Sequence, residues 1–297
     1  MAKCHTQEGV NTMKGILELE CEDIQPVEEE NLMIVDCLNL SFRYKHRGQT
    51  DFASDYLRTI NSLAKSYGAK TVVLAADWKS SAFRKDVSAD YKSNRKALYK
   101  DQTPEEKKKF ADFFEGYEKS LTLAQKSYPM LRFLNVEADD IATYLVKQVK
   151  QKYKHTWLIS TDRDWDLLLD ENVSRFSYVT RKEYTIGNFY DEHGCDTPEQ
   201  YISVKVLQGD AGDGVIGVPL VGAKRAYNLI REHGSALDIF TSLPLEGTQK
   251  FIANINASDD LILRNYELMD LLSYCEEAIA FPNPDNIAEI QEFCDKL

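Results

Sequence analysis

The sequence lacks the long apolar segment that a membrane-spanning helix requires. Its longest apolar runs, such as residues 32–35 and 72–76, are far shorter than the roughly 18 residues that suffice to cross a bilayer. The N-terminus also lacks a basic stretch followed by an apolar one, so no secretory signal is predicted. Because 43% of the 297 residues are hydrophobic and 28% are charged, the composition excludes disordered, collagen-like and coiled-coil proteins. It predicts one large globular domain or two smaller ones.

Paired cysteines are absent as well. The six cysteines form no Cys-x-x-Cys motif and no regular spacing, which argues against a zinc ribbon or a disulfide framework. His193 and Cys195 are close enough in sequence to donate two metal ligands, but reduced thiols are the simpler interpretation. We therefore predict a cytoplasmic protein with free thiols.

The sequence also lacks an excess of positive charge. The chain carries 36 basic and 48 acidic residues, for a net charge of −12. Residues 1–31 contain two basic and eight acidic residues, and residues 235–297 contain three and twelve. The segment between them has a net charge of +3, so it can present basic surface to phosphates although the sequence pI is about 5.0. We interpret residues 1–30 as an acidic, flexible leader.

Short apolar segments alternate with amphipathic helices over residues 31–200. The predicted strands are residues 32–36, 71–77, 131–136 and 156–160. Apolar residues recur at helical spacing over residues 56–64 and 138–149. Continuous apolar strands that alternate with such helices are typical of an α/β fold, in which helices flank a mostly parallel central sheet on both faces. Residues 31–200 are therefore predicted to form an α/β core.

A basic segment interrupts this core between the second and third predicted strands. Residues 79–109 contain ten Lys or Arg and five acidic residues, with aromatic residues interspersed and few aliphatic ones. A solvated surface helix is one interpretation. A nucleic-acid contact is the other, because cations bind phosphates and aromatic rings stack on unpaired bases. Lys92 and Arg95 stand one helical turn apart, which suits two contacts to one phosphate, and Tyr91 is suited to base stacking.

Residues 201–297 are predicted to be mostly helical. Glycine and proline at 217–222 predict a hairpin between two helices, and Lys224 and Arg225 follow it directly. Such a helix-hairpin-helix motif, here spanning about residues 209–234, holds a DNA phosphate with backbone N–H groups and cations and reads no sequence. An ordinary corner between two packed helices is the alternative interpretation.

Acidic residues gather where the predicted strands end. They are Asp36 and Asp77 after the first two strands, Glu137, Asp139 and Asp140 after the third, and Asp162, Asp164 and Asp166 after the fourth. Because the carboxyl ends of parallel strands share one edge of a sheet, we expect one acidic crevice there. Asp210 and Asp213 stand three residues apart and share a face if that segment is helical. Each acid alone has an ordinary explanation as a helix cap or as a partner of a helix dipole.

A crevice with seven or eight carboxylates requires counter-charge. Two like unit charges about 4 Å apart repel by roughly 4 kcal/mol at an effective dielectric constant of about 20. Oxygen ligands without His or Cys are typical of Mg²⁺, for which Mn²⁺ can substitute. Two such ions can activate an attacking water and stabilise the leaving oxygen of a phosphodiester. The carboxylates therefore predict metal-dependent phosphodiester hydrolysis.

The order and spacing of these motifs resemble the flap endonucleases of the 5′ nuclease superfamily, most closely the bacteriophage type of the T-five group. The resembling segments are residues 34–40, 77, 91–95, 136–140, 158–166, 208–213 and 222–225. The resemblance implies a structure-specific 5′ nuclease, both flap endonuclease and 5′-3′ exonuclease, that hydrolyses DNA phosphodiester bonds near junctions of single and double strands. It also implies a helical arch at about residues 79–110, which the single-stranded 5′ end enters, and a helix-hairpin-helix on the duplex side.

The resemblance further implies roles for individual residues. The first Mg²⁺ would be held by Asp77, Glu137, Asp139 and Asp162, and the second by Asp164, Asp210 and Asp213. Catalytic support would come from Lys92, Arg95, Asp36 and Asp140. The candidate DNA contacts are Arg43, Tyr91, Lys96, Lys224 and Arg225. The resemblance also implies a potassium ion at the hairpin. We further expect a monomer, because no exposed heptad or apolar stripe argues for a larger assembly, and a functional link to a DNA polymerase in replication or repair.

Three positions depart from the family pattern. Cys37 replaces a glycine, Gly214 replaces an asparagine, and Leu220 replaces the middle glycine of the hairpin. Leucine disfavours the left-handed backbone conformation that glycine adopts freely, so Leu220 bears on hairpin geometry, potassium binding and duplex affinity. Every expected metal ligand is present, and catalysis is predicted to survive. Two alternatives remain open, namely a PIN-like ribonuclease without arch and hairpin, and a scaffold that recognises DNA junctions without cutting them.

Overall fold

The computed structural model describes the backbone of residues 28–297, and their side chains except those of residues 28, 29, 96–98 and 100. The predicted acidic leader, residues 1–30, therefore lies almost entirely outside the described residues. Among the helices that are described, none combines the length and the apolar character needed to cross a membrane.

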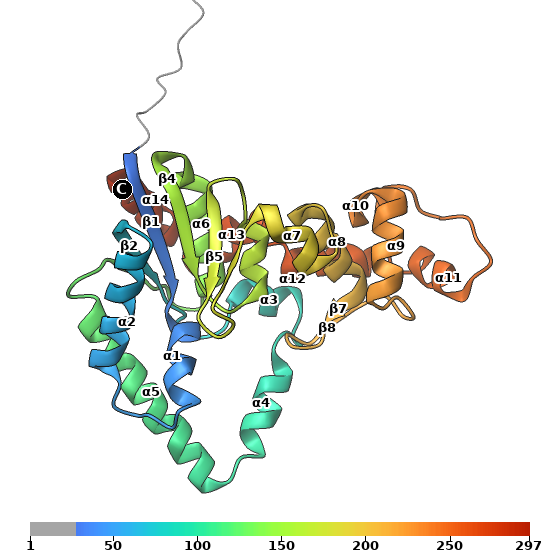
Figure 1. Cartoon of the computed structure of the whole chain (residues 1–297). Coiled ribbons are helices and arrows are strands. Elements are labelled where there is room, and N and C mark those ends of the chain that lie inside the picture. Colours follow the sequence, from blue (N-terminus) through green and yellow to red (C-terminus); the bar gives the residue numbers. More distant parts are fainter. Residues whose placement is uncertain (1–27) are drawn as a thin grey trace, which may run out of the picture.

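A six-stranded sheet forms the centre of the molecule, in the order β3-β2-β1-β4-β5-β6 (Figure 1). The strands are β1 Glu28–Asp36, β2 Ala69–Ala75, β3 Met130–Leu131, β4 Tyr153–Ile159, β5 Val173–Ser177 and β6 Lys182–Tyr184. Neighbouring strands in this sheet are parallel from β3 to β5, and β6 is antiparallel to β5. The mostly parallel sheet predicted from the sequence is confirmed.

Helices cover both faces of the sheet because the side chains of β1 alternate between two hydrophobic clusters. Leu32 and Ile34 belong to one cluster, and Met33 and Val35 belong to the other. The first face is covered by α6 Ala138–Val149, α13 Leu271–Ala280 and α14 Asp285–Lys296. The opposite face is covered by α1 Cys37–Lys45, α2 Ala53–Ser66 and α5 Pro104–Ala124. The last two helices of the chain thus return to the N-terminal sheet.

The edges of the sheet differ from the sequence prediction. Of the strand predicted at 131–136, only β3 forms, because Asn135 adopts φ +61° and its N–H donates to the Trp78 carbonyl. The apolar pattern arose instead from a loop that packs on the core. The predictions missed β5 and β6, since β5 buries Ser174 and Arg175 in place of an apolar run.

The basic segment forms an arch-like projection. It contains α3 Ala82–Val87 and α4 Ser93–Lys100, and it continues into α5. Figure 1 shows α4 and α5 as two arms that leave the body of the molecule and meet in a loop away from the sheet. Thr103 begins α5 with a capping box, in which its side chain accepts the Glu106 N–H and the Glu106 carboxylate accepts the Thr103 N–H.

The remaining elements form a helical region beside the sheet (Figure 1). They are α7 Phe189–His193, α8 Pro198–Gln208, β7 Gly209–Asp210, β8 Val215–Ile216, α9 Ala223–His233, α10 Ala236–Thr241, α11 Lys250–Asn256 and α12 Asp259–Met269. Short 3₁₀ turns are η1 Lys150–Lys152, η2 Arg163–Leu168 and η3 Ile186–Asn188. This region has its own hydrophobic cluster, in which Val206, Ala226 and Ile255 are fully buried.

Candidate active site

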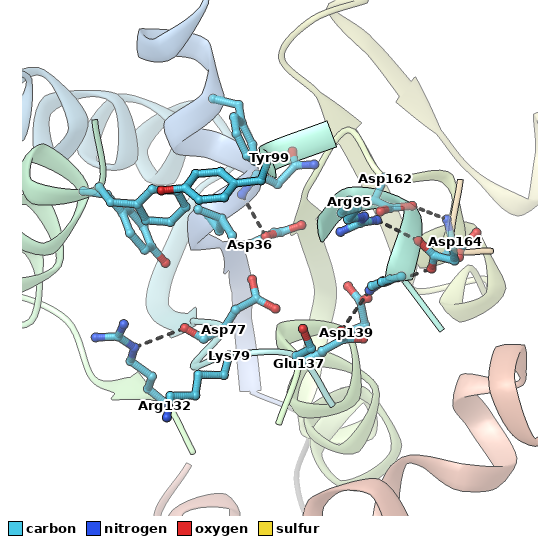
Figure 2. A pocket seen from close by; sticks show the side chains of 18 of the residues that line it. Asp36, Asp77, Lys79, Arg95, Tyr99, Arg132, Glu137, Asp139, Asp162 and Asp164 are labelled. Carbon is cyan, nitrogen blue, oxygen red and sulfur yellow. Dashed lines mark hydrogen bonds and ion pairs between the residues drawn. The ribbon is translucent and has the colours of Figure 1, made fainter. Parts of the chain in front are cut away.

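A cavity of about 730 Å³ opens at the edge of the sheet. Its acidic lining residues are Asp36, Asp77, Glu118, Glu137, Asp139, Asp162, Asp164 and Asp213. Asp36 ends β1, Asp77 follows β2 and Asp162 follows β4, so the parallel strands bring these acids together as the sequence predicts. Figure 2 shows the side chains of Asp36, Asp77, Glu137 and Asp139 around one shared space.

A second cavity, of about 810 Å³, adjoins the first and is lined by Asp210. The two cavities share Arg95, Asp162, Asp164 and Asp213. All seven residues predicted to hold metal ions therefore line one or both of these cavities.

Two acids of the predicted crevice lie outside it. The oxygens of Asp140 accept hydrogen bonds from Arg84 at 2.7 Å each, and those of Asp166 accept from Arg175 at 2.6 and 2.7 Å. Successive helical residues are rotated by about 100°, so Asp140 does not share the cavity-facing side of α6 with Asp139. The prediction that Asp166 lines the crevice is wrong, and Asp140 can act on the site only through Arg84.

Asp210 ends β7, and Asp213 lies in the turn between β7 and β8. The segment is not helical, so the condition under which the two acids would share a helical face is not met. Gly209 and Gly214 bracket the turn with φ of +80° and +73°, in the left-handed region that favours glycine. A Cβ on Gly209 would lie 2.3 Å from a backbone nitrogen. Asp210 Oδ1 accepts the Gly212 N–H at 2.8 Å and closes the turn.

The base of the arch is fastened to this turn. The Lys92 N–H donates to the Asp213 carbonyl at 2.8 Å, and Lys92 adopts φ +55°. Its ammonium group lies 2.9 Å from Glu137 and 3.7 Å from Asp213, while Arg95 donates to Asp213 at 2.6 Å. A left-handed backbone at a non-glycine residue costs roughly 1–2 kcal/mol and persists only where the surroundings fix it. Lys92 is therefore held over the acids by both its backbone and its side chain.

Lys205 on α8 is a site residue that the sequence reasoning missed. Its ammonium group contacts Asp164 and lies 3.3 Å from Asp210. The side chain is buried, yet the two acids raise the pKa of Lys205 against the effect of burial. A single lysine in the otherwise apolar stretch 204–207 was the one signal that could have revealed it.

The first cavity carries more negative charge than its cations neutralise. Burial and the neighbouring acids raise the pKa of Asp36 and Asp139 well above the usual range. Burial and Glu137 raise the pKa of Asp77 to about 6. Glu137 behaves in the opposite way, because Lys92 and Arg84 outweigh its burial and lower its pKa to about 2. Asp36, Asp77 and Asp139 are thus the acids whose negative charge the cations of the cavity do not compensate.

This donor set fits hard divalent cations. Every candidate ligand in the cavities is a carboxylate oxygen, the type that Mg²⁺ and Mn²⁺ prefer. In the present side-chain positions, residues 28–297 contain no group of three or more His, Cys, Asp or Glu gathered closely enough to hold a metal ion. Lys92 and Lys205 form ion pairs with four of the candidate ligands, Glu137, Asp164, Asp210 and Asp213, so bound metal ions would compete with these ammonium groups.

The predicted DNA contacts near the arch have different surroundings. The ring of Tyr91 is 4% exposed and its hydroxyl donates to Glu137 at 3.0 Å, so the predicted base-stacking role is not supported. Arg43 lies half-buried on α1, outside the cavity lining. Lys96 lies on α4, but its side chain is outside the described residues. Tyr91 instead helps to orient Glu137.

Aromatic side chains line the wall of the first cavity opposite the acids. They are Phe42 from α1, Tyr99 from α4, and Phe110, Phe114 and Tyr117 from α5. Tyr99 is 43% exposed, and Figure 2 shows its ring extending across the cavity beside Asp36. The lining of the cavity therefore combines charged groups with aromatic rings.

Arg84 connects the arch to the rest of the protein. Besides its bonds to Asp140, its Nε donates to the Leu268 carbonyl of α12 at 2.9 Å, and Nη1 lies 3.6 Å from Glu137. It is 1% exposed. The sequence reasoning counted Arg84 among the surface cations of the basic segment, and this interpretation is wrong.

The hairpin at 217–222 joins β8 to α9. Val218 and Val221 are buried beneath it, whereas Leu220 is 52% exposed and adopts φ +67°. Arg225 Nη1 donates to the Leu220 carbonyl at 2.5 Å, so this predicted DNA contact braces the hairpin. Lys224 is exposed beside it.

Two family models match the chain. The N-terminal resolvase-like domain of 5′-3′ exonucleases matches residues 31–195, and the C-terminal SAM fold of 5′-3′ exonucleases matches residues 196–286. The chain belongs to the 5′-3′ exonuclease family. The α/β fold, the helical C-terminal region and a nuclease function are therefore those of this family.

Individual relatives agree with this assignment. The flap endonuclease of Escherichia phage T5 is 47% identical over 268 residues, which cover 90% of this chain and 92% of that protein. A solved structure of the bacteriophage T5 D15 flap endonuclease, a pseudo-enzyme–product complex with DNA and metal ions, has a TM-score of 0.87 and 46% identity, over 90% of this chain and 98% of that one. DNA polymerase I of Lactococcus lactis subsp. cremoris is 25% identical over 248 residues, which cover 80% of this chain and 27% of that protein.

The structure accommodates two of the departures from the family pattern without strain. Cys37 is buried at the first position of α1, with a helical backbone that any residue can adopt. Gly214 has the left-handed backbone that both glycine and asparagine tolerate, and a Cβ there would lie 2.9 Å from the Asp90 carbonyl. Leu220 differs, because its left-handed backbone costs roughly 1–2 kcal/mol.

Proposed function

We propose that this nuclease is a Mg²⁺-dependent, structure-specific flap endonuclease and 5′-3′ exonuclease that hydrolyses DNA near junctions of single and double strands. The observation that carries the proposal is the acidic cavity directly beneath the base of the arch, where Lys92 and Arg95 contact the same acids that line it. The close relative from phage T5 is named a flap endonuclease, which supports this substrate class.

The donor set supports two metal ions. The first would be held by Asp77, Glu137, Asp139 and Asp162, and the second by Asp164, Asp210 and Asp213. When bound, such ions supply a nucleophilic water and stabilise the leaving oxygen of an in-line displacement. Burial and, to a lesser extent, repulsion between neighbouring acids raise the pKa values of Asp77 and Asp139, which supports this occupancy, because a cation between the acids would remove the repulsion.

The cationic residues of the chain would position the scissile phosphate. Lys92 and Arg95 already lie over the acids, and a phosphate entering the cavity would give each an anionic partner there. Lys205 would lie beside the second ion and offset charge on Asp164 and Asp210. Asp36 lines the cavity as a supporting acid, and Asp140 supports the site through Arg84.

Substrate shape would be selected by the two projections. The arch and its aromatic wall suit a single-stranded 5′ end, because rings stack on unpaired bases of any sequence. Arg43 and Lys96 would add phosphate contacts there. The start of α9 with Lys224 suits a phosphate of the duplex. The hairpin carbonyls of Val218, Pro219 and Leu220 accept hydrogen bonds from Val221, Asn254 and Arg225. Each oxygen has a second lone pair, with which it would coordinate a potassium ion at the hairpin.

The match to part of a DNA polymerase I supports action alongside a polymerase during replication or repair. We accordingly propose that the protein acts on replicating DNA. We also propose that it acts as a monomer in the cytoplasm, which would be the host cytoplasm for a viral protein.

The decisive test is cleavage of a labelled duplex that carries a 5′ flap. We expect cleavage near the junction in Mg²⁺ or Mn²⁺ and none with excess chelator. A flap of RNA on the same duplex distinguishes a PIN-like ribonuclease, which would cut the RNA flap better than the DNA flap. A protein that binds the junction and leaves every flap intact in both metals would be a scaffold, and the proposal would be wrong.

A further inference from the structure

The leucine at the tip of the hairpin is not explained by the fold. Leu220 adopts φ +67°, a conformation that glycine adopts without cost. Its side chain is 52% exposed, so core burial does not compensate for the unfavourable backbone. Strained positions that are not needed for packing are found mostly at functional sites.

The hairpin presents Leu220 on a rigid support. Val221 donates to the Val218 carbonyl at 3.0 Å, and both valines are buried. Asn254 donates to the Pro219 carbonyl at 2.7 Å, and Arg225 donates to the Leu220 carbonyl at 2.5 Å. Each backbone carbonyl from 218 to 220 therefore accepts a hydrogen bond that restrains the hairpin. The restrained backbone leaves the Leu220 side chain exposed to solvent.

The surroundings of Leu220 are suited to a nucleic-acid backbone. Ile216 on β8 is 67% exposed, which adds a second apolar side chain to this end of the molecule. Gly222 caps α9 without a side-chain bond to its N–H groups, and Lys224 is exposed in the first turn. Leu220 is two residues before Gly222, so at most about 7 Å of chain separates it from the helix start at which a phosphate would bind.

We propose that Leu220 makes an apolar contact with the deoxyribose edge of the duplex next to the phosphate bound at α9, and so increases affinity for duplex over single-stranded DNA. This inference rests on the proposed function, because it takes duplex DNA as the occupant of the hairpin surface. The contact reads no sequence, since every nucleotide presents the same sugar carbons.

Four variants test the contact. L220N and L220G remove the apolar tip and keep residues that tolerate the left-handed backbone. L220M keeps an apolar tip. L272A is the matched control, because Leu272 is a 40% exposed leucine on α13, which packs on the sheet away from the hairpin. Fluorescence anisotropy in chelator measures binding to a labelled duplex and to a labelled single strand of the same sequence.

We expect L220N and L220G to weaken duplex binding about three- to tenfold, as the loss of one or two buried methylene groups would. Single-strand binding should change less than twofold, the melting temperature should not fall, and L220M and L272A should bind as the native protein does. Unchanged duplex binding in L220N and L220G would overturn the inference, as would equal weakening for both ligands or a loss that follows a lower melting temperature. A native protein that cuts no flap contradicts the proposed function, whereas native cleavage with unchanged variants contradicts the Leu220 contact alone.

Discussion

The acidic cavity and the hairpin carry opposite charge in opposite surroundings, because the cavity contains buried carboxylates and the hairpin is followed by exposed cations. The cavity concentrates buried carboxylates from strands that are far apart in sequence, so the pKa of Asp36 is raised by burial and by Asp77. The hairpin is local and exposed, and its cations Lys224 and Arg225 follow one another in sequence. We therefore expect the cavity to determine the rate of hydrolysis and the hairpin to determine the affinity for duplex DNA.

The largest effect is expected from Asp162→Asn. The substitution removes a carboxylate that lines both cavities, so cleavage of the flap should fall by at least about 10²-fold at saturating Mg²⁺. Duplex affinity, measured by anisotropy in chelator, should stay within about threefold. Asp260→Asn, an exposed acid on α12, is the control. A D162N variant that loses duplex binding as strongly as cleavage would refute the division between cavity and hairpin.

The next largest effect is expected at Arg84. Replacing it with Met leaves Asp140 buried without its partner, which typically costs about 3–5 kcal/mol of unfolding free energy. R84K keeps the charge and should recover part of the stability. Urea unfolding gives the free energies, and steady-state kinetics on the folded fraction gives kcat and KM.

Arg84 is a positioning residue because it lies 3.6 Å from Glu137 without lining either cavity. We expect the folded fraction of R84K to have a lower kcat, a higher Mg²⁺ concentration for half-maximal activity, and an unchanged KM. A variant whose folded fraction has native kinetics would restrict Arg84 to a structural role.

A smaller effect is expected from Lys224→Ala. Because this exposed lysine would contact one phosphate, duplex affinity should fall about tenfold at low salt, and the slope of log Kd against log salt should decrease by about 1. The rate at saturating DNA should not change. Lys250→Ala, on α11, is a matched exposed lysine that should leave both quantities unchanged. An unaltered salt slope would show that duplex binding takes place elsewhere.

The sequence predicts the carboxylate edge of the sheet better than it predicts what surrounds it. Asp36, Asp77 and Asp162 follow recognisable strands, and parallel strands place their ends together whatever the loops do. Lys205 and Arg84 were not predicted as site residues. A sequence does not distinguish a buried cation from a surface cation, because the carboxylate that pairs with the buried one is distant along the chain.

The local structure around Asp210 and Asp213 could not be predicted for a different reason. Their three-residue spacing is compatible with a helix, but the flanking Gly209 and Gly214 adopt positive φ, which a helix does not allow. The base-stacking role predicted for Tyr91 is not supported because its neighbours in sequence are polar, while its ring belongs to the hydrophobic cluster of the helical region and its hydroxyl donates to Glu137, 46 positions away. Contacts of long sequence separation are not available to any local pattern.

The smallest expected effect concerns the far end of the arch. Thr103→Ala removes the capping box of α5, which should weaken the start of this helix by about 1 kcal/mol. Because Thr103 lines neither cavity, the rate for a short 5′ overhang should not change, while hydrogen exchange at the first turn of α5 should accelerate about fivefold. A 5′ flap of many nucleotides depends on the arch over its whole length, so its cleavage should slow by about two- to threefold. If cleavage of short and long substrates slowed equally, the effect would lie in the cavity. The arch would then have no separate role in selecting the single strand.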